Sequence, residues 1–139
     1  MTARGLRDNN PGNLRPGAQK WLGEIAPDSG YCCFDMPEHG IRAMAKNVLA
    51  YQTKHGLSTI RGIITRYAPA VDSNDTEAYI AAVASDAGLG ADATLDLNDA
   101  SVLSSLVLAI IRHENGSDPY SVLIVERACS AAVGDGLEW

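Results

Sequence analysis

The stretch AIIRHENG, residues 109–116, joins an apolar segment to a charged cluster and a glycine. Together with the residues before it, this stretch predicts a helix over about 99–113 that stops near Gly116. Spacings of four, three and four residues place four side chains on one face of that helix: Leu103, Val107, Ile110 and Glu114. We therefore expect Glu114 to extend a buried apolar stripe at the C-terminal end of the helix.

The end of an apolar stripe is an unusual environment for a carboxylate. A low dielectric and the negative end of the helix dipole both disfavour the charged form of Glu114. A carboxylic acid that stays protonated near neutral pH is what a general acid needs in order to protonate a leaving oxygen. The alternative is a helix-terminal glutamate that turns to water or pairs with Arg112, and spacing alone favours this alternative.

The remaining hydrophobic pattern predicts a mainly helical fold with one small β-hairpin near its start. Aromatic and apolar residues flank the turn at 27–30, which indicates the hairpin. The segment NNPGNLRPG, residues 9–17, is rich in turn-forming residues, and we expect an ordered loop there. With 139 residues, of which 46% are hydrophobic, the chain is expected to form a single domain over residues 1–139.

Capping residues predict where the other helices begin and end. Capping boxes open helices at Asp35, with Pro37 in the first helical position, and at Asn74, while single caps open helices at Ser58 and Asn98. Gly56 is expected to end the first of these helices and Pro69 the second. A last helix follows Tyr120 and ends near Gly134.

The charge and the apolar runs exclude several classes of function. A formal net charge of −6 argues against wide contact with nucleic acid, which depends on Lys and Arg. A cluster of Arg4, Arg7 and Arg15 near the N-terminus is interpreted as a solvated loop. No apolar run approaches the roughly 20 residues that span a bilayer, and we expect no stable membrane insertion. The chain begins without a signal peptide pattern, so we expect synthesis in a cytoplasm.

The sequence calls for no metal and no cofactor. It has no phosphate loop and no dinucleotide motif, and its three histidines are too scattered for a zinc site. Cys32, Cys33 and Cys129 form no disulfide framework, because neighbouring cysteines rarely bridge and the count is odd. We interpret them as reduced packing residues.

Together with its flanking residues, the stretch AIIRHENG resembles the helix-end signature of the lysozyme-like superfamily. In lytic transglycosylases and related muramidases an apolar helix ends in Glu-Ser-Gly or a close variant, and that glutamate is the catalytic acid. The variant here is Glu114-Asn115-Gly116. The whole pattern, from GLRDNNPGNLR through HGIRAM to IIRHENG, also resembles small bacteriophage lysozyme-like or virion-associated proteins over about residues 4–125.

The N-terminal half resembles the region on the C-terminal side of the catalytic helix in autolysin-type glucosaminidases. The matching motifs, in order, are NNPGN at 9–13, Trp21-Leu22-Gly23, GYCCF at 30–34, Glu38-His39-Gly40-Ile41, Tyr67-Ala68-Pro69 and Tyr79. Because the order matches but the catalytic helix comes last, the resemblance implies a mainly α, lysozyme-like α+β fold that is circularly permuted. Termini that lie close together make such a permutation tolerable.

The resemblance also implies the site. Glu114 takes the place of the general acid. Tyr67 takes that of a catalytic tyrosine that lines the cleft near the acid and orients substrate, although core packing explains Tyr67 equally well. Asn10 and Asn13 match loop positions that face the cleft, where they either bind N-acetyl groups or serve only the turn. The implied substrate-binding set is completed by His113, Asn115 and Tyr79.

The implied substrate is bacterial peptidoglycan, cleaved at the β-1,4 bond between N-acetylmuramic acid (MurNAc) and N-acetylglucosamine (GlcNAc). A lytic transglycosylase needs one acid, whereas a hydrolytic muramidase needs a second carboxylate to place water, for which Glu24, Asp28 and Asp118 are candidates. The implied protein is a phage endolysin that awaits a holin, or a lysin carried in the virion. The alternative is a non-catalytic virion or wall-binding protein that kept the fold.

Overall fold

The computed structural model describes residues 4–68 and 75–134, and within them the chain is mainly helical with one two-stranded antiparallel sheet, as predicted. The elements are α1 (Arg4–Arg7), β1 (Glu24–Asp28), β2 (Tyr31–Phe34), α2 (Pro37–His55), α3 (Ile60–Tyr67), α4 (Thr76–Ala87), α5 (Ala100–Asn115) and α6 (Val122–Val133). The described helices include none that is long and apolar enough to cross a membrane.

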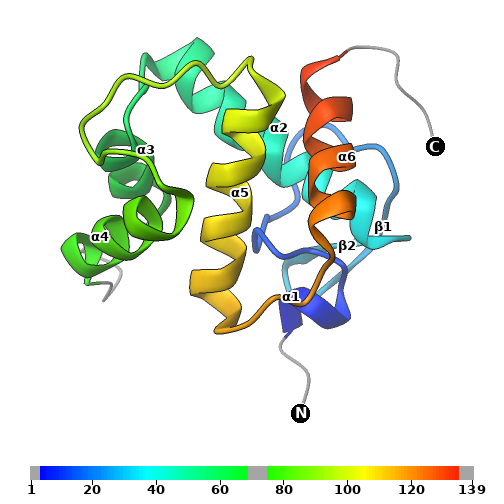
Figure 1. Ribbon diagram of the computed structural model, residues 1–139. Helices are drawn as coiled ribbons and strands as arrows, with labels where there is room; N and C mark the ends of the chain where they lie inside the picture. Colours follow the sequence, from blue (N-terminus) through cyan, green and yellow to red (C-terminus); the bar gives the residue numbers. More distant parts are fainter. Residues whose placement is uncertain (1–3, 69–74, 135–139) are drawn as a thin grey trace.

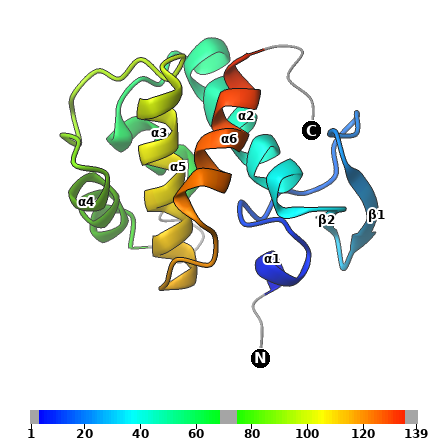
Figure 2. The ribbon, with the colours of Figure 1, turned by 45° about the vertical axis from the view of Figure 1, so that its right-hand side comes forward.

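Helix α5 is the centre of the fold (Figure 1). It packs against α4 on one side and α6 on the other, and α6 packs in turn on α2. Its apolar stripe is fully buried at Leu103, Leu106, Val107, Ile110 and Ile111. Each such side chain contributes about 1.5–3 kcal/mol when removed from water, so this helix anchors the main core. Its C-terminal end lies on the same side of the molecule as α1 (Figure 2).

Three helices begin one residue later in the sequence than predicted. Thr59, Asp75 and Asp99 are the N-caps, and their side chains accept hydrogen bonds from backbone N–H groups of the first turn. The predicted caps Ser58 and Asn98 are therefore wrong. The predicted cap Asn74 lies outside the described residues. In each case a neighbour with the same capping chemistry occupies the cap, because burial of the apolar stripe fixes the phase of the helix.

The capping box predicted for α2 is also wrong. Met36 is the N-cap and makes no side-chain capping bond, although Pro37 does occupy the first turn as predicted. The Asp35 carboxylate instead lies 2.6 Å from Nδ1 of His39, one turn along the helix. The Asp35 carboxylate is thus paired with the imidazole of a buried histidine and does not accept from a backbone N–H group of the first turn.

The ends of the helices follow the sequence more closely. Gly56 and Gly116 adopt left-handed conformations, both with φ of 67°, and terminate α2 and α5 as predicted. Helix α5 reaches Asn115 rather than His113, so Glu114 is part of its last turn. Pro69, the predicted stop of α3, lies outside the described residues, and α3 itself ends at Tyr67.

The predicted hairpin is present and turns through Ser29 and Gly30, both of which have positive φ. The expected turn began two residues earlier, but Pro27 and Asp28 belong to β1. The pairing register shifts between Ile25 and Asp28, so Pro27 lies in an irregular part of the strand. Its missing N–H group therefore removes no regular hydrogen bond between the two strands.

The N-terminal loop is ordered, as predicted, because it packs closely on α2. The carbonyl oxygen of Asn9 approaches Gly40 so closely that a Cβ atom there would lie 1.6 Å from it. Backbone bonds also join Phe34 N–H to the Asp8 carbonyl and Cys32 N–H to the Leu14 carbonyl. The loop is thereby held against both β2 and the first turns of α2.

Candidate functional site

Two surface hollows meet at Glu114. The first has a volume of about 330 Å³, and the residues that line it include Asn13, Arg15, Tyr51, Tyr67 and Glu114. The second has a volume of about 290 Å³ and is lined by Arg4, Gly5, Pro11, Asn13, Glu114 and Asn115. Because Asn13 and Glu114 belong to both, we treat the two hollows as one site and call it the Glu114 cleft.

Glu114 is solvent-exposed, as in the alternative of a helix-terminal glutamate that turns to water, and the expectation of a buried carboxylate is wrong. Helix spacing correctly placed it in line with the apolar stripe, but burial ends at Ile111, one turn earlier. The last turn of α5 extends beyond the core and presents Glu114 to the cleft. The alternative pairing with Arg112 is also absent, because Arg112 binds Asp86 and Asp118 instead.

Tyr79 holds Glu114 in place. Its hydroxyl donates a hydrogen bond to Oε1 of Glu114 at 3.0 Å, which is the one hydrogen bond that Glu114 receives within the described residues. The Tyr79 side chain comes from α4 and is almost fully buried. Burial raises the pKa of Tyr79 well above its usual range, and the negative charge of Glu114 raises it further. Tyr79 therefore remains a protonated donor at any physiological pH.

Tyr67 lies in the Glu114 cleft and also packs against the main core. Its hydroxyl donates to the Gly12 carbonyl at 3.0 Å, so it ties the N-terminal loop to α3. Burial, and then the charge of Glu114, raise the pKa of Tyr67 beyond its ordinary range. Core packing therefore describes Tyr67, which also lines the cleft, and a catalytic role for it stays a prediction.

The asparagines of the N-terminal loop have different roles. Asn13 lines both hollows and is exposed, as the resemblance implied. Asn10 is not in the cleft, because its side chain is buried and already engaged. Its amide donates to the carbonyls of Leu14 and Cys32 and accepts from the Leu14 N–H, each at 3.0 Å. Asn10 therefore shapes the loop and leaves Asn13 to face the cleft.

The residues that flank Glu114 are also divided between cleft and surroundings. Asn115 lines the second hollow, while its amide donates to the Ile111 carbonyl at 2.8 Å. His113 is exposed and lines neither hollow. Its ring lies on that of Tyr79, with centroids 3.9 Å apart, so it covers the tyrosine that contacts Glu114. Any contribution of His113 to the site is therefore made through Tyr79.

Glu114 is the only carboxylate among the described residues that line the cleft. Of the candidates for a second acid, Glu24 accepts a hydrogen bond from the Trp21 N–H at 2.9 Å, in the hairpin. Asp28 pairs with Arg7 at 3.1 Å, and Asp118 binds Arg112. None of the three lines either hollow, so the described residues provide no partner to place a water molecule opposite Glu114.

Two arginines in the cleft were missed by the sequence interpretation. Arg4 and Arg15 were assigned to a solvated loop with Arg7, but each lines one of the hollows. Both guanidinium groups lie over the ring of Tyr31, at 3.6 and 4.3 Å from its centroid. The one available signal was their position on either side of the NNPGN loop, which the resemblance places at the cleft.

A small cluster of potential metal ligands lies apart from the cleft. The ligand atoms of Asp8, Asp28 and Cys33 lie within 4.8 Å of one another, in a combination that zinc accepts. Burial is the main reason that the pKa of Asp8 is raised, whereas the Arg7 hydrogen bond lowers the pKa of Asp28. Arg7 already supplies positive charge to this cluster, and the absence of a metal or cofactor requirement stays a prediction.

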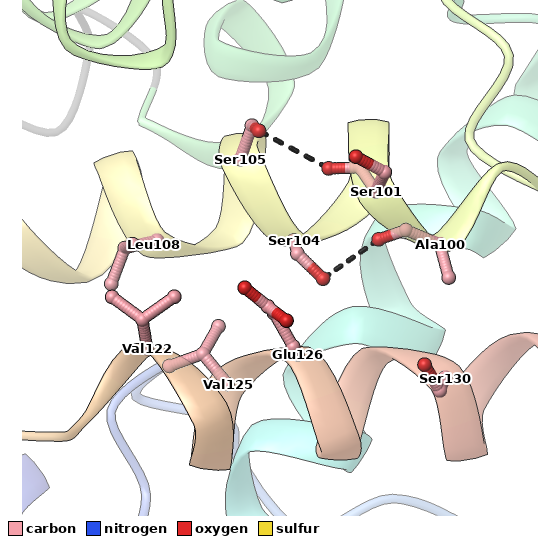
Figure 3. A pocket seen from close by; sticks show the side chains of 9 residues that line it. All are labelled: Ala100, Ser101, Ser104, Ser105, Leu108, Val122, Val125, Glu126 and Ser130. Carbon is pink, nitrogen blue, oxygen red and sulfur yellow. Dashed lines mark hydrogen bonds between the residues drawn. The ribbon is translucent and has the colours of Figure 1, made fainter.

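A further hollow, of about 340 Å³, lies between α5 and α6 (Figure 3). The hydroxyls of Ser104 and Ser105 line it, but they donate to the carbonyls of Ala100 and Ser101 within their own helix. Its lining includes one carboxylate, Glu126, and among the described residues neither an aromatic nor a cationic side chain. The Glu114 cleft therefore offers the richer chemistry although its hollows are no larger.

Comparison with known proteins gives a phage context. No protein-family model matches the chain. Over 142 residues it is 39% identical to a protein called Protein P5 of Pseudoalteromonas phage PM2, an alignment that covers 99% of this chain and 81% of that protein.

Proposed function

We propose that this chain, which belongs to the family of Protein P5 of Pseudoalteromonas phage PM2, is a phage peptidoglycan-cleaving glycosidase with Glu114 as its general acid. One observation carries this proposal. The NNPGN loop and the ENG motif, about one hundred residues apart in sequence, supply Asn13, Glu114 and Asn115 to the same cleft. These are the two motifs on which the resemblance to lysozyme-like proteins depends, and a shared active site would require them to meet.

The proposed reaction is cleavage of the β-1,4 bond between MurNAc and GlcNAc. Glu114 would protonate the glycosidic oxygen, with Tyr79 fixing the carboxyl group through its hydrogen bond. Asn13 and Asn115, which line the cleft together with Glu114, would bind N-acetyl groups of the substrate. Since Glu114 is exposed in the free protein, bound glycan must exclude water from it before proton transfer becomes efficient.

Of the two chemistries, we favour that of a lytic transglycosylase. An inverting or retaining hydrolase uses a second carboxylate, and the described lining of the cleft has none besides Glu114. In a transglycosylase the acetamido group of the substrate stabilises the developing cation. Glu114 would then accept the proton of the C6 hydroxyl, and the product is a 1,6-anhydro sugar formed without water.

The fold that goes with this proposal is a circularly permuted lysozyme-like domain spanning the chain. The helix that bears the acid, α5, comes late in the sequence, and the loop, hairpin and α2 that would come after it in autolysin-type relatives come first. In a phage such a protein would act on the cell wall after holin-dependent release, or from the virion, with peptidoglycan as its partner. It would need neither nucleic acid nor a cofactor.

A non-catalytic virion or wall-binding protein is the second candidate. The exposure of Glu114 favours it, because a general acid is usually sheltered from water. This protein would keep the cleft and bind glycan strands without cutting them. The two candidates share the same ligand and differ only in whether a bond is broken.

The test is mass spectrometry of the soluble products from purified sacculi. The native protein is compared with Glu114→Gln and with Glu126→Gln, which removes an exposed carboxylate from the hollow between α5 and α6. We expect 1,6-anhydro-muramyl ends from the native and Glu126→Gln proteins and none from Glu114→Gln. Reducing ends would indicate a hydrolase. Equal release by all three would refute Glu114 as the acid, and binding of sacculi without release would favour the second candidate.

A further inference from the structure

Arg4 and Arg15 differ from the arginines of this protein that are paired with acidic side chains. Arg7, Arg61 and Arg112 each pair with two carboxylates. Within the described residues, Arg4 and Arg15 form no ion pair, although the chain as a whole carries a net charge of −6. Acidic residues are thus plentiful, yet neither of these two cations is neutralised by one.

The two guanidinium groups are held in position by an aromatic ring rather than by acids. Both lie over Tyr31, and Arg15 also donates a hydrogen bond to the Tyr31 hydroxyl at 2.9 Å. Stacking of this kind orients the planar group and leaves N–H donors at its edge for another acceptor. Nε of Arg4 is buried and has no hydrogen-bond partner in the described structure, so its donor capacity is unused.

The placement of these cations matches the course of the cleft. Arg4 lines the second hollow and Arg15 the first, so one guanidinium lies in each of the hollows that meet at Glu114. Glu114 is the only negative group in the described lining. A ligand that spans the cleft would therefore meet positive charge in both hollows, and a planar guanidinium fork matches the geometry of a carboxylate.

We propose that Arg4 and Arg15 form carboxylate-binding subsites. Through them the cleft binds muramyl sugars, which carry a carboxylate on the lactyl arm, in preference to neutral saccharides. This inference rests on the proposed function. In a glycan strand every second sugar carries a lactyl arm, so one strand can present acidic groups to both hollows. The carboxylate belongs to the lactyl group itself in stripped glycan and to the attached peptide in intact peptidoglycan.

The test measures binding and needs no cleavage. The native protein is titrated at low salt with three probes, and binding is followed by NMR chemical shifts. The probes are MurNAc, which has a free lactyl carboxylate, N-acetylmuramyl-L-alanyl-D-isoglutamine, whose carboxylate is on the peptide, and GlcNAc, which is neutral. We expect at least one acidic probe to bind about fivefold more tightly than GlcNAc, the upper range for an exposed charge pair. Which acidic probe binds more tightly identifies the source of the carboxylate.

Matched variants assign the selectivity to the arginines. Arg4→Gln and Arg15→Gln should each reduce the preference for the acidic probe, whereas Lys54→Gln, the same charge change at an exposed residue that lines neither hollow, should keep it. Thermal unfolding of each variant shows that the fold is retained. Equal binding of acidic and neutral probes, no binding of any probe, or equal loss in Lys54→Gln would overturn the subsites.

The two proposals fail in different ways. Selective binding of the acidic probe together with no release from sacculi would refute the glycosidase and leave the subsites standing. Release of anhydro-muramyl products without any preference for the acidic probe would refute the subsites and leave the glycosidase standing.

Discussion

Replacing Tyr79 with phenylalanine tests how Glu114 is positioned. The change removes one hydroxyl, whose oxygen lies 3.0 Å from Oε1 of Glu114, and keeps the buried ring that packs in the core and under His113. Water can replace the lost donor because Glu114 is exposed, so the free energy of unfolding should fall by only about 0.5–1 kcal/mol. The main consequence should be on activity, since Glu114 loses its only hydrogen bond within the described residues.

We expect Tyr79→Phe to lower kcat on soluble peptidoglycan fragments about tenfold, which corresponds to about 1.4 kcal/mol of lost transition-state stabilisation. KM should change little, because the hydroxyl orients the acid and is not placed to bind sugar. Product release is followed by chromatography, and the free energy of unfolding is measured separately by urea titration. The stability measurement tests the contact even if the protein proves not to be an enzyme.

Tyr120→Phe is the matched control. The Tyr120 hydroxyl is also buried but has no hydrogen-bond partner in the described structure, so its removal breaks no bond. It should leave kcat within error of the native protein and should not lower stability, because it removes a buried hydroxyl that has no hydrogen-bond partner. If Tyr79→Phe and Tyr120→Phe have the same kcat, or if kcat falls only in proportion to the unfolded fraction, Tyr79 does not position Glu114.

Two further predictions concern stability. Gly40→Ala should lower the free energy of unfolding by about 3 kcal/mol or more, because the new Cβ would lie 1.6 Å from the Asn9 carbonyl oxygen. Gly17→Ala, with open space around it, should leave the free energy of unfolding unchanged. Equal urea midpoints for the two variants would contradict this packing. Stability should also fall as pH rises above about 10, because the unfolded chain releases phenolic protons that Tyr67 and Tyr79, with their raised pKa values, retain. Urea titrations between pH 8 and 11 measure this slope, and Tyr67→Phe should reduce it; an unchanged slope in that variant would count against the raised pKa.

The helices were predictable because their apolar stripes are strong and their glycine stops are unambiguous. The spacing of Leu103, Val107 and Ile110 could only be a helix, and Gly116 ended it as expected. The cap positions were less certain because neighbours with the same capping chemistry compete, as Ser58 and Thr59 do. Local sequence supplies both candidates, and only the packing of the helix against the rest of the core selects between them.

For Glu114 the sequence left two alternatives open, burial on the apolar stripe and contact with water. Helix periodicity tells which face a residue lies on, but not how far along that face the neighbouring elements extend. The same limit applies to Asn10 and Asn13, which both belong to a turn, although one is buried in its own loop and the other faces the cleft. Arg4 and Arg15 become cleft residues only because α1 and the loop fold against Tyr31, a contact that no local pattern records.

The exposure of Glu114 changes where its acid function would have to come from. The protein alone keeps water away from a carboxyl group that is buried in apolar surroundings, whereas an exposed carboxyl group is shielded from water only when the substrate binds. A glycan strand that fills both hollows would cover Glu114 and would bring its own acidic groups to Arg4 and Arg15. Binding energy gained at those cations, away from the reacting bond, would then offset the cost of desolvating the acid. In this arrangement binding of a strand across both hollows and desolvation of the acid occur together, whereas a ligand that fills a single hollow would meet one arginine and leave Glu114 partly open to water.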